Sequence, residues 1–508
     1  MPRPDRAAAL DHIVVIMFEN RSFDNLLGRL YQPGEVPAFE GVAGRDLSNP
    51  VPGWAPGGPG RIGYGVAAGM NTPSPDPGEE YQHVNTQLFG LIDPPSNRGR
   101  LAGAMAAPYN APAGPSPAPT MDGFVTDYIS ATLAFTGRMP GPAEYGQIMT
   151  GYAPGQMPVL SALARGFATF DHWFCDVPTE TFANRSFLHA ATSSGYVVNA
   201  SPPEAFPLFN TAETIFDRLD AHGLSWRVYC DPPSHVSVTG IIHARRLLSR
   251  FATHFSSTDR FYEDAAGGRL PAYSFIEPNL IYGHNDMHPA FDVMFPGARM
   301  DPPSSLIGGE ALLARVYDAI RGSGAHAYDT LLLVTFDEHG GTYDHVPPPA
   351  AAPPDPSAPP GQLGFTFTRA GVRVPAVAIS PWIPERAVRT EVFHNSSVIT
   401  TLRRRWSLGP PLTGRDAAAP DLAPVLTLER PRPPEDWPQV TPRPVPAYQV
   451  PDAALLPALP RAALFAGLEL ARWLGLPAPG LAADEQVLRN DGIQLLIEVA
   501  GHLFPGLG

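Results

Sequence analysis

Two apolar stretches of the sequence end in polar side chains that could bind a cation. The run 12–18 (HIVVIMF) is followed by Glu19 and Asn20, and the run 330–336 (TLLLVTF) by Asp337 and Glu338. In an open parallel α/β sheet, ligands bind outside the carboxyl ends of the strands, so these distant pairs can meet at one edge. Several oxygen ligands at one point favour a divalent metal such as Ca, Zn, Mg or Mn. A single acidic strand end would instead be typical of a helix cap or a solvated turn.

A third polar segment, 177–185 (VPTETFANR), contains a possible nucleophile. Thr181 lies at a predicted strand-to-helix turn, where free backbone N–H groups make an anion site. A threonine beside a metal can lose its proton and attack phosphorus. Asn184 and Arg185 could then bind phosphate oxygens. The alternative is that Thr181 only caps the helix.

Three histidines lie close to these segments. They are His288 in GHNDMHP, His345 in YDHV and His83 in the predicted loop EEYQHVN. A histidine near an acidic metal site can donate to a phosphate or protonate a leaving alcohol. Most of the 15 histidines are expected to be structural or exposed.

Strand and helix patterns alternate along the chain. Strands are predicted at 12–18, 167–175, 226–230, 272–277, 330–336 and 373–380, and helices at 157–165, 213–222, 308–323 and 396–406. This alternation predicts an α/β fold with a mainly parallel central sheet flanked by helices. Pro-rich segments at 103–120 and 347–362 are predicted loop insertions. We expect a catalytic domain at 1–420, then a Pro-rich linker and a C-terminal helical appendage at 421–508, with helices near 460–475 and 483–503 that pack on the core.

Composition limits the partners and the compartment. The chain has 508 residues, a net charge of −14 and only arginine among its 35 basic residues. The negative charge argues against nucleic acid as a partner. There is no apolar run of transmembrane length and no visible export signal, so we expect a cytoplasmic protein, or an exported one if the N-terminus was trimmed. Cys175 and Cys230 could form one bridge or stay free thiols.

In combination, these motifs resemble those of the bacterial phospholipase C and acid phosphatase family of phosphoesterases. The resemblance covers residues 12 to about 420. It rests on the segments ENRSFD (19–24), Thr181-x-x-Asn184-Arg185, NDxHP (285–289) and DEHGGxYDHVPP (337–348), supported by MTGY (149–152), RVPA (373–376) and Arg415-Asp416.

The resemblance implies an alkaline-phosphatase-like core and a covalent phospho-enzyme formed beside a metal. Thr181 matches the nucleophile, and Thr179 is the weaker alternative. The implied metal shell comprises Glu19, Asn20, Thr181, Asp337 and Glu338, and the implied phosphate-binding or proton-donating residues are His83, His288 and His345. The chain departs from the family pattern at Glu180, an additional carboxylate whose role stays open, and at Ala183.

The resemblance implies phospholipase C activity on a phosphodiester such as a phosphatidylcholine-like phospholipid or a phosphocholine ester. One alternative is a broad acid phosphatase acting on soluble phosphomonoesters. Another is a non-catalytic binding protein on a phosphoesterase scaffold, with the C-terminal helices in peripheral contact with a membrane or a partner. A choline group would favour an acidic or aromatic pocket, and the aromatic residues near the motifs are Trp173, Tyr282, Tyr343 and Trp382.

Overall fold

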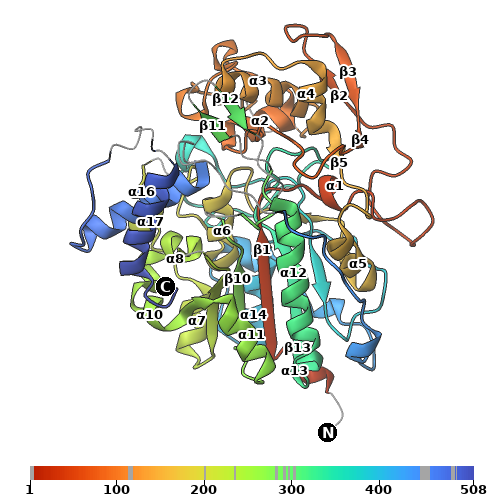
Figure 1. Ribbon diagram of the computed structural model, residues 1–508, viewed down its shortest axis with the longest axis vertical. Coiled ribbons are helices and arrows are strands. Elements are labelled where there is room, and N and C mark those ends of the chain that lie inside the picture. Colours follow the sequence, from red (N-terminus) through yellow and green to blue (C-terminus); the bar gives the residue numbers. More distant parts are fainter. Residues whose placement is uncertain are drawn as a thin grey trace.

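An eight-stranded sheet forms the centre of the molecule, with strand order β15-β6-β14-β13-β1-β10-β8-β9 (Figure 1). The computed structural model describes residues 5–112, 118–199, 202–233, 236–280, 284–289, 293–295, 298–300, 305–446, 458–481, 487 and 489–507. The strands are β1 (His12–Phe18), β6 (Ala168–Phe170), β8 (Trp226–Cys230), β9 (Phe255–Ser257), β10 (Tyr273–Glu277), β13 (Thr330–Phe336), β14 (Val377–Ile379) and β15 (Ala387–Arg389). Five of the seven pairings are parallel, and β14 is antiparallel to both of its neighbours. The predicted α/β class with a mainly parallel sheet is confirmed.

Two of the predicted strands are shorter than their apolar runs. The run 167–175 is divided into β6 in the main sheet and β7 (Trp173–Phe174), which pairs with β16 (Phe393–His394). In the run 373–380, only Val377–Ile379 forms a strand. The start of the run lies beside β7 instead: Arg373 forms an isolated antiparallel bridge with Phe174, and the Val374 N–H donates to the Trp173 carbonyl at 2.9 Å.

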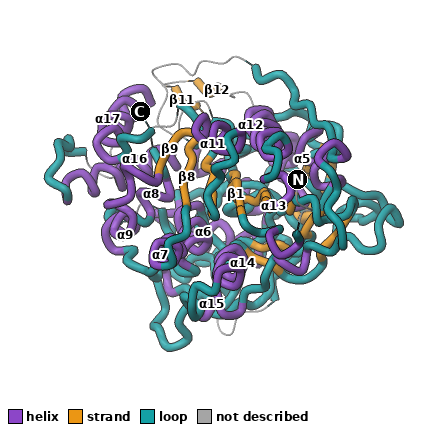
Figure 2. Tube along the Cα trace, turned by 90° about the horizontal axis from the view of Figure 1, so that it is seen from below, coloured by secondary structure: helices purple, strands orange, loops and turns teal. Residues whose placement is uncertain are grey.

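Helices cover both faces of the sheet (Figure 2). On one face lie α5 (Pro158–Gly166), α11 (Thr258–Ala266) and α12 (Ser305–Arg321), and on the other α6 (Thr181–Ala190), α7 (Ile215–Ala221) and α14 (Ser397–Trp406). The central strands β1 and β13 are buried over nearly their whole length, as their apolar sequences require. Shorter elements at the rim are α9 (Ala244–Leu247), α10 (Phe251–His254), α13 (His326–Asp329), α15 (Gly414–Ala418), β11 (Val293–Phe295) and β12 (Ala298–Met300).

Most of the segment between β1 and β6, the part before α5, forms a lobe over the carboxyl ends of the central strands (Figure 1). Its elements are α1 (Phe23–Leu26), α2 (Tyr81–Phe89), α3 (Phe124–Thr136), α4 (Pro142–Tyr145) and the short strands β2 (Ser48–Val51), β3 (Gly60–Gly63), β4 (Gly65–Val66) and β5 (Thr150–Gly151). The lobe has its own apolar cluster, which includes Val84, Phe124 and Ile129. His83 lies within α2, so the prediction that it belongs to a loop was wrong.

The C-terminal helices α16 (Ala458–Trp473) and α17 (Arg489–Leu503) pack against each other and on the core. Helix α16 also lies against α8 (Val238–Ile242) and the short helix Ala205–Phe209. Leu464, Leu468 and Leu496 are buried in the same apolar cluster as the central sheet. The apolar face of α16 is therefore covered by protein, while the domain boundary at residue 420 stays a prediction.

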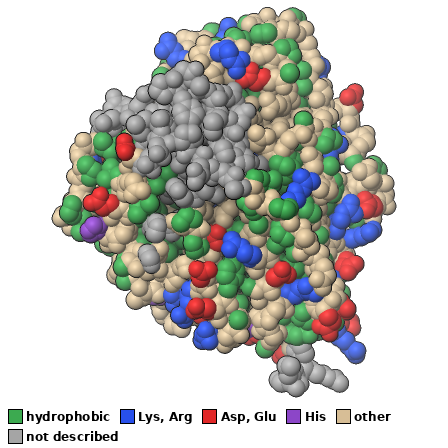
Figure 3. Space-filling view, viewed as in Figure 1, with side chains coloured by type: hydrophobic (Ala, Val, Ile, Leu, Met, Phe, Trp, Pro, Cys, Tyr) green, Lys and Arg blue, Asp and Glu red, His purple; other side chains and the backbone are tan. Residues whose placement is uncertain are grey.

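The surface in Figure 3 carries acidic and basic side chains interspersed over its lower half, without a field of one sign. In the described part of the chain, no helix has the length and apolar character needed to cross a bilayer. Both cysteines, Cys175 and Cys230, are buried free thiols, which decides between the two alternatives left by the sequence.

Candidate functional site

The two polar strand ends meet, because β1 and β13 are parallel neighbours with Phe18 opposite Phe336. The next residues of each strand are therefore side by side. The backbone N–H of Asn20 donates to Asp337 Oδ1 at 3.2 Å, and that of Arg21 donates to the carbonyl of Glu338 at 3.1 Å. Glu19, Asn20, Asp337 and Glu338 are all fully buried. Strand register thus brings together the four residues that the sequence predicts to share a site.

Thr181 is the first residue of α6 and points to this cluster. Its hydroxyl donates to Glu19 Oε2 at 3.2 Å. The N-cap of α6 is Glu180, and its side chain makes no capping hydrogen bond. The interpretation of Thr181 as a simple cap is therefore wrong. The hydroxyl instead lies at a helix N-terminus, where backbone N–H groups stabilise an anion.

Arg185 lies one turn after Thr181 and is fully buried. Its Nε donates to Glu19 Oε1 at 2.9 Å and lies 3.6 Å from Asp337 Oδ2. Burial lowers the pKa of Arg185, but the charges of Glu19 and Asp337 overcome this effect and raise it. The guanidinium therefore holds the two carboxylates in place.

The side chain of Asn184 makes hydrogen bonds within the turn that precedes Thr181. Its Oδ1 accepts from the Val177 N–H at 3.0 Å, and its Nδ2 donates to the Thr179 carbonyl at 2.7 Å. These contacts shape the turn 177–181. The side chain of Asn184 is thus engaged by the turn, whereas Nη1 of Arg185 is buried and has no hydrogen-bond partner among the described residues. The role of the two residues in binding substrate phosphate stays a prediction.

The three predicted histidines lie in different surroundings. His288 Nε2 is 2.6 Å from Asn20 Nδ2, and burial lowers the pKa of His288 to about 4. His83 Nδ1 is 2.8 Å from Asp127 Oδ1. Burial opposes protonation of His83, but the Asp127 carboxylate raises its pKa to about 9.

His345 belongs to a separate network. Its Nδ1 is 2.6 Å from Asp24 Oδ2, and its Nε2 is 3.1 Å from Glu40 Oε1. Arg373 bridges Asp24 and Asp344 in the same network. Among the described residues, no hydrogen bond or ion pair joins His345 to the strand-end cluster. Its contacts with Asp24 lie at the segment after β1, and its catalytic role stays a prediction.

Sequence reasoning missed one carboxylate of the cluster. Glu79 comes from the lobe, is 7% exposed and accepts a hydrogen bond from Asn20 Nδ2. It also lies 3.7 Å from His288 Nε2. The only signal in the sequence was the pair Glu79-Glu80 just before a helix, which is a common arrangement at helix starts and carries no specific chemistry.

The charges of this cluster fit a divalent cation. Burial and the charge of Asp337 raise the pKa values of Glu19 and Glu338 well above the ordinary range, and burial raises that of Asp337. Three buried oxygens, Asn20 Oδ1, Asp337 Oδ2 and Glu338 Oε1, accept no hydrogen bond within the described chain. Buried carboxylates normally need a cation or a donor, so these oxygens suit a hard metal ion.

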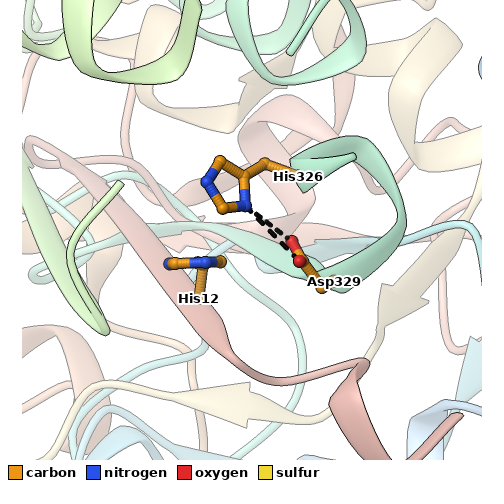
Figure 4. A group of neighbouring side chains, drawn as sticks. All are labelled: His12, His326 and Asp329. Atoms are coloured by element: carbon orange, nitrogen blue, oxygen red, sulfur yellow. Dashed lines mark hydrogen bonds and ion pairs between the residues drawn. The ribbon is translucent and has the colours of Figure 1, made fainter. Parts of the chain in front are cut away.

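A second group with metal-ligand chemistry lies at the opposite edge of the sheet (Figure 4). His12 begins β1, and His326 Nδ1 is 3.1 Å from Asp329 Oδ1, just before β13. The rings of His12 and His326 pack edge-to-face with centroids 4.1 Å apart, and His12 Nδ1 is 2.9 Å from the Pro271 carbonyl. This group joins the amino ends of the strands, far from Thr181.

The raised carboxyl pKa values predict a stability that depends on pH and metal. The folded state holds protons on Glu19, Glu79 and Glu338 that the unfolded chain releases. Without metal, the free energy of unfolding should therefore fall as the pH rises above the unfolded carboxyl pKa of about 4.3. Divalent cation should flatten this fall, because it favours the ionised carboxylates. Thermal melting at several pH values, with chelator or with added cation, measures both slopes. If the melting temperature depends on pH in the same way with chelator and with added cation, the result would contradict a cation site here.

Comparison with known proteins identifies the family. The model of the Phosphoesterase family matches residues 10–409. Non-specific phospholipase C1 from Arabidopsis thaliana is 32% identical over 447 residues, covering 85% of this chain and 73% of that protein. Phospholipase C A from Mycobacterium tuberculosis is 25% identical (85% and 79% covered), and non-hemolytic phospholipase C from Pseudomonas aeruginosa is 27% identical (83% and 58% covered).

Similarity to solved structures is low. A protein of the alkaline phosphatase superfamily from Vibrio parahaemolyticus matches 52% of this chain and 64% of its own, with a TM-score of 0.32 and 14% identity. The family model and the relatives agree with the motifs seen in the sequence. This chain belongs to the Phosphoesterase family and is a phosphoric ester hydrolase.

Proposed function

We propose that this chain is a phospholipase C type hydrolase that cleaves a phosphodiester through a phospho-threonine at Thr181. The observation that carries the proposal is the Thr181 hydroxyl, which lies at the N-terminus of α6 and donates to Glu19 beside the joined strand ends. The names of the relatives support the diester substrate, since the plant and bacterial proteins above are phospholipases C. The aromatic residues that the sequence suggests for a choline pocket do not add to this support: Trp173, Tyr343 and Trp382 are core residues, and Tyr282 lies outside the described residues.

Glu19, Asn20, Asp337 and Glu338, together with the Thr181 hydroxyl, would hold a divalent cation. When bound, the cation would lower the pKa of that hydroxyl and offset negative charge on the phosphoryl group. The buried oxygens without hydrogen bonds support this assignment. Elemental analysis of the purified protein distinguishes Ca, Zn, Mg and Mn.

The chain's own residues account for the remaining steps. Thr181 Oγ1 gives its proton to Glu19 and attacks phosphorus, and the bond from phosphorus to the leaving alcohol breaks. The Phe182 N–H is used by Asn199 Oδ1 at 2.7 Å, and the other N–H groups of the first turn of α6 stabilise the phosphoryl oxygens. His83 is protonated at neutral pH, because Asp127 raises its pKa, and it supplies the proton to the leaving alkoxide. Water then cleaves the phospho-threonine.

Two chromogenic substrates distinguish this proposal from a phosphatase and from a binding protein. They are assayed with enzyme to which divalent cation has been restored. Faster cleavage of p-nitrophenylphosphorylcholine than of p-nitrophenyl phosphate is expected, and phosphatidylcholine vesicles should then yield diacylglycerol and phosphocholine. Preference for the monoester would make the chain a phosphatase. Inactivity on every substrate with metal bound would favour a binding protein.

Asp127→Asn should shift the pH profile of the reaction. Asp127 is 2% exposed, and loss of its charge leaves burial as the main influence on His83. The alkaline limb of kcat/KM should move to lower pH by about 1–3 units. The matched control is Asp122→Asn, because the side chain of Asp122 is 48% exposed and pairs with the surface residue Arg61 at 3.6 Å. An unchanged alkaline limb of kcat/KM in Asp127→Asn would show that His83 is not the proton donor.

A further inference from the structure

Three side chains with the ligand types of a zinc site meet at the amino ends of β1 and β13 (Figure 4). His12 is the first residue of β1, and His326 and Asp329 begin and end α13, directly before β13. His12 lies opposite Thr330 in the sheet, so strand register brings the three side chains together. The group lies at the edge of the sheet opposite to Thr181 and takes no part in the proposed reaction.

Each of the two imidazole rings is held by the backbone through one of its nitrogens. His12 Nδ1 is 2.9 Å from the Pro271 carbonyl. His326 Nε2 faces Gly268, and the ring forms a hydrogen bond with the backbone of that residue. Metal-binding histidines commonly donate one ring N–H in this way, which orients the ring and leaves the opposite nitrogen for the metal. The nitrogens left for a ligand are His12 Nε2 and His326 Nδ1.

A neutral His326 places two hydrogen-bond acceptors against each other. Its Nδ1 lies 3.1 Å from Asp329 Oδ1 and 3.4 Å from Oδ2. Because the Nε2–H is directed to Gly268, the contact between Nδ1 and the carboxylate needs a proton or a metal ion between them. Tetrahedral zinc, with bonds of about 2.0–2.2 Å, places neighbouring ligand atoms roughly 3.4 Å apart. The observed separations therefore suit a shared ion.

The group is complete enough, and open enough, to take up an ion. The donor atoms of the three residues all lie within 4.8 Å of one another. The side chains of His326 and Asp329 are 15% and 24% exposed, so an ion can reach them and they can close on it. Asp11, the other carboxylate that acts on both rings, is paired with Arg405. Two imidazoles and one carboxylate, with water in the fourth position, are a ligand set for zinc rather than for Mg or Ca.

We propose that His12, His326 and Asp329 form a zinc site separate from the oxygen-ligand cluster at Glu19 and Asp337. The ion joins the start of β1 to the helix that leads into β13. It therefore stabilises the two central strands at the end opposite to the nucleophile. An ion that binds only the folded chain raises its melting temperature. The inference does not depend on the hydrolase activity.

Zinc titration of the Glu338→Gln variant tests the site, because that substitution is directed at the strand-end cation. The full chain is treated with chelator, dialysed and titrated with Zn²⁺ by calorimetry in excess Mg²⁺, which competes for oxygen ligands but not for imidazole. One Zn²⁺ per chain should bind and raise the melting temperature. Addition of His326→Gln or Asp329→Asn should weaken binding by at least about 100-fold, since loss of an outer partner of a ligand alone commonly costs about 10–100-fold.

The matched control is His222→Gln in the same background. His222 is an exposed residue at the end of α7, with Nδ1 2.8 Å from the Arg218 carbonyl, and its loss should leave zinc affinity unchanged. Absence of bound zinc in Glu338→Gln would overturn the site, and so would an equal zinc affinity with and without the changes at His326 and Asp329. Melting in chelator shows whether each variant is folded. If His326→Gln is not folded, Asp329→Asn, which keeps the shape of the side chain, decides the test.

Discussion

Thr181→Ala is expected to lower kcat by at least about 10⁴-fold, because removal of a nucleophile from a site that acts as a unit abolishes its whole pathway. The Thr181 hydroxyl is fully buried, and the one hydrogen bond that it donates goes to Glu19. The alanine variant should keep its fold, since the change removes one small polar group. Turnover of a chromogenic diester, measured beside thermal melting, checks both statements.

Serine variants at two positions are the controls for this prediction. Thr181→Ser keeps a hydroxyl at the same place and should retain measurable turnover. Thr179 donates to the Val197 carbonyl at 2.6 Å, which marks it as a structural residue of the turn, so Thr179→Ser should keep near wild-type kcat. Full activity of Thr181→Ala, or loss confined to the Thr179 variant, would move the nucleophile away from Thr181.

Glu338→Gln is expected to remove bound divalent cation and to lower kcat by at least about 10³-fold, the scale of losing a principal electrostatic contact in a preorganised site. Its Oε1 is buried and accepts no hydrogen bond within the described chain. Because glutamine has the same shape without the charge, the metal-free variant should be at least as stable as metal-free wild type. Elemental analysis and melting in chelator measure the two effects.

Glu310→Gln provides a matched control for the loss of a buried carboxylate. Glu310 is 1% exposed, accepts from the N–H groups of Val159 and Leu160 at the start of α5, and has a pKa raised to about 7 by burial. Its substitution should leave metal content unchanged. Full metal content in Glu338→Gln, or an equal loss of bound metal in Glu338→Gln and Glu310→Gln, would contradict the assignment of Glu338 as a metal ligand.

Long apolar strands could be predicted well from the sequence. β1, β8, β10 and β13 agree with their predicted ranges within one residue, because a strand buried on both faces needs a continuous apolar run. The direction of β14 could not be predicted, since its sequence is equally apolar in either orientation and the contacts with β13 and β6 decide it.

The lobe was harder to predict. Helix α2 has the sequence YQHVNTQLF, in which polar residues dominate and are nevertheless buried by hydrogen bonds such as Gln87 Nε2 to Asp127 Oδ2 at 2.8 Å. Such burial depends on partners from α3, which no local pattern reveals. Glu79 was missed for the same reason, and the lobe places it beside Asn20.

The site itself was partly predictable. The convergence of Glu19, Asn20, Asp337 and Glu338 follows from a general rule of parallel sheets, without knowledge of side-chain contacts. The place of His345 does not follow from this rule, because it is set by a pairing with Asp24 of helix α1, at 2.6 Å. Motif spacing gave no information on that pairing.

The most direct test of the central claim is mass spectrometry of the enzyme quenched with acid during turnover of p-nitrophenylphosphorylcholine. The account predicts a phosphocholine adduct on Thr181 in the peptide that spans residues 177–185, present in wild type and absent in Thr181→Ala. An adduct on another residue, or a burst of p-nitrophenol release without an adduct on Thr181, would contradict a covalent mechanism at Thr181.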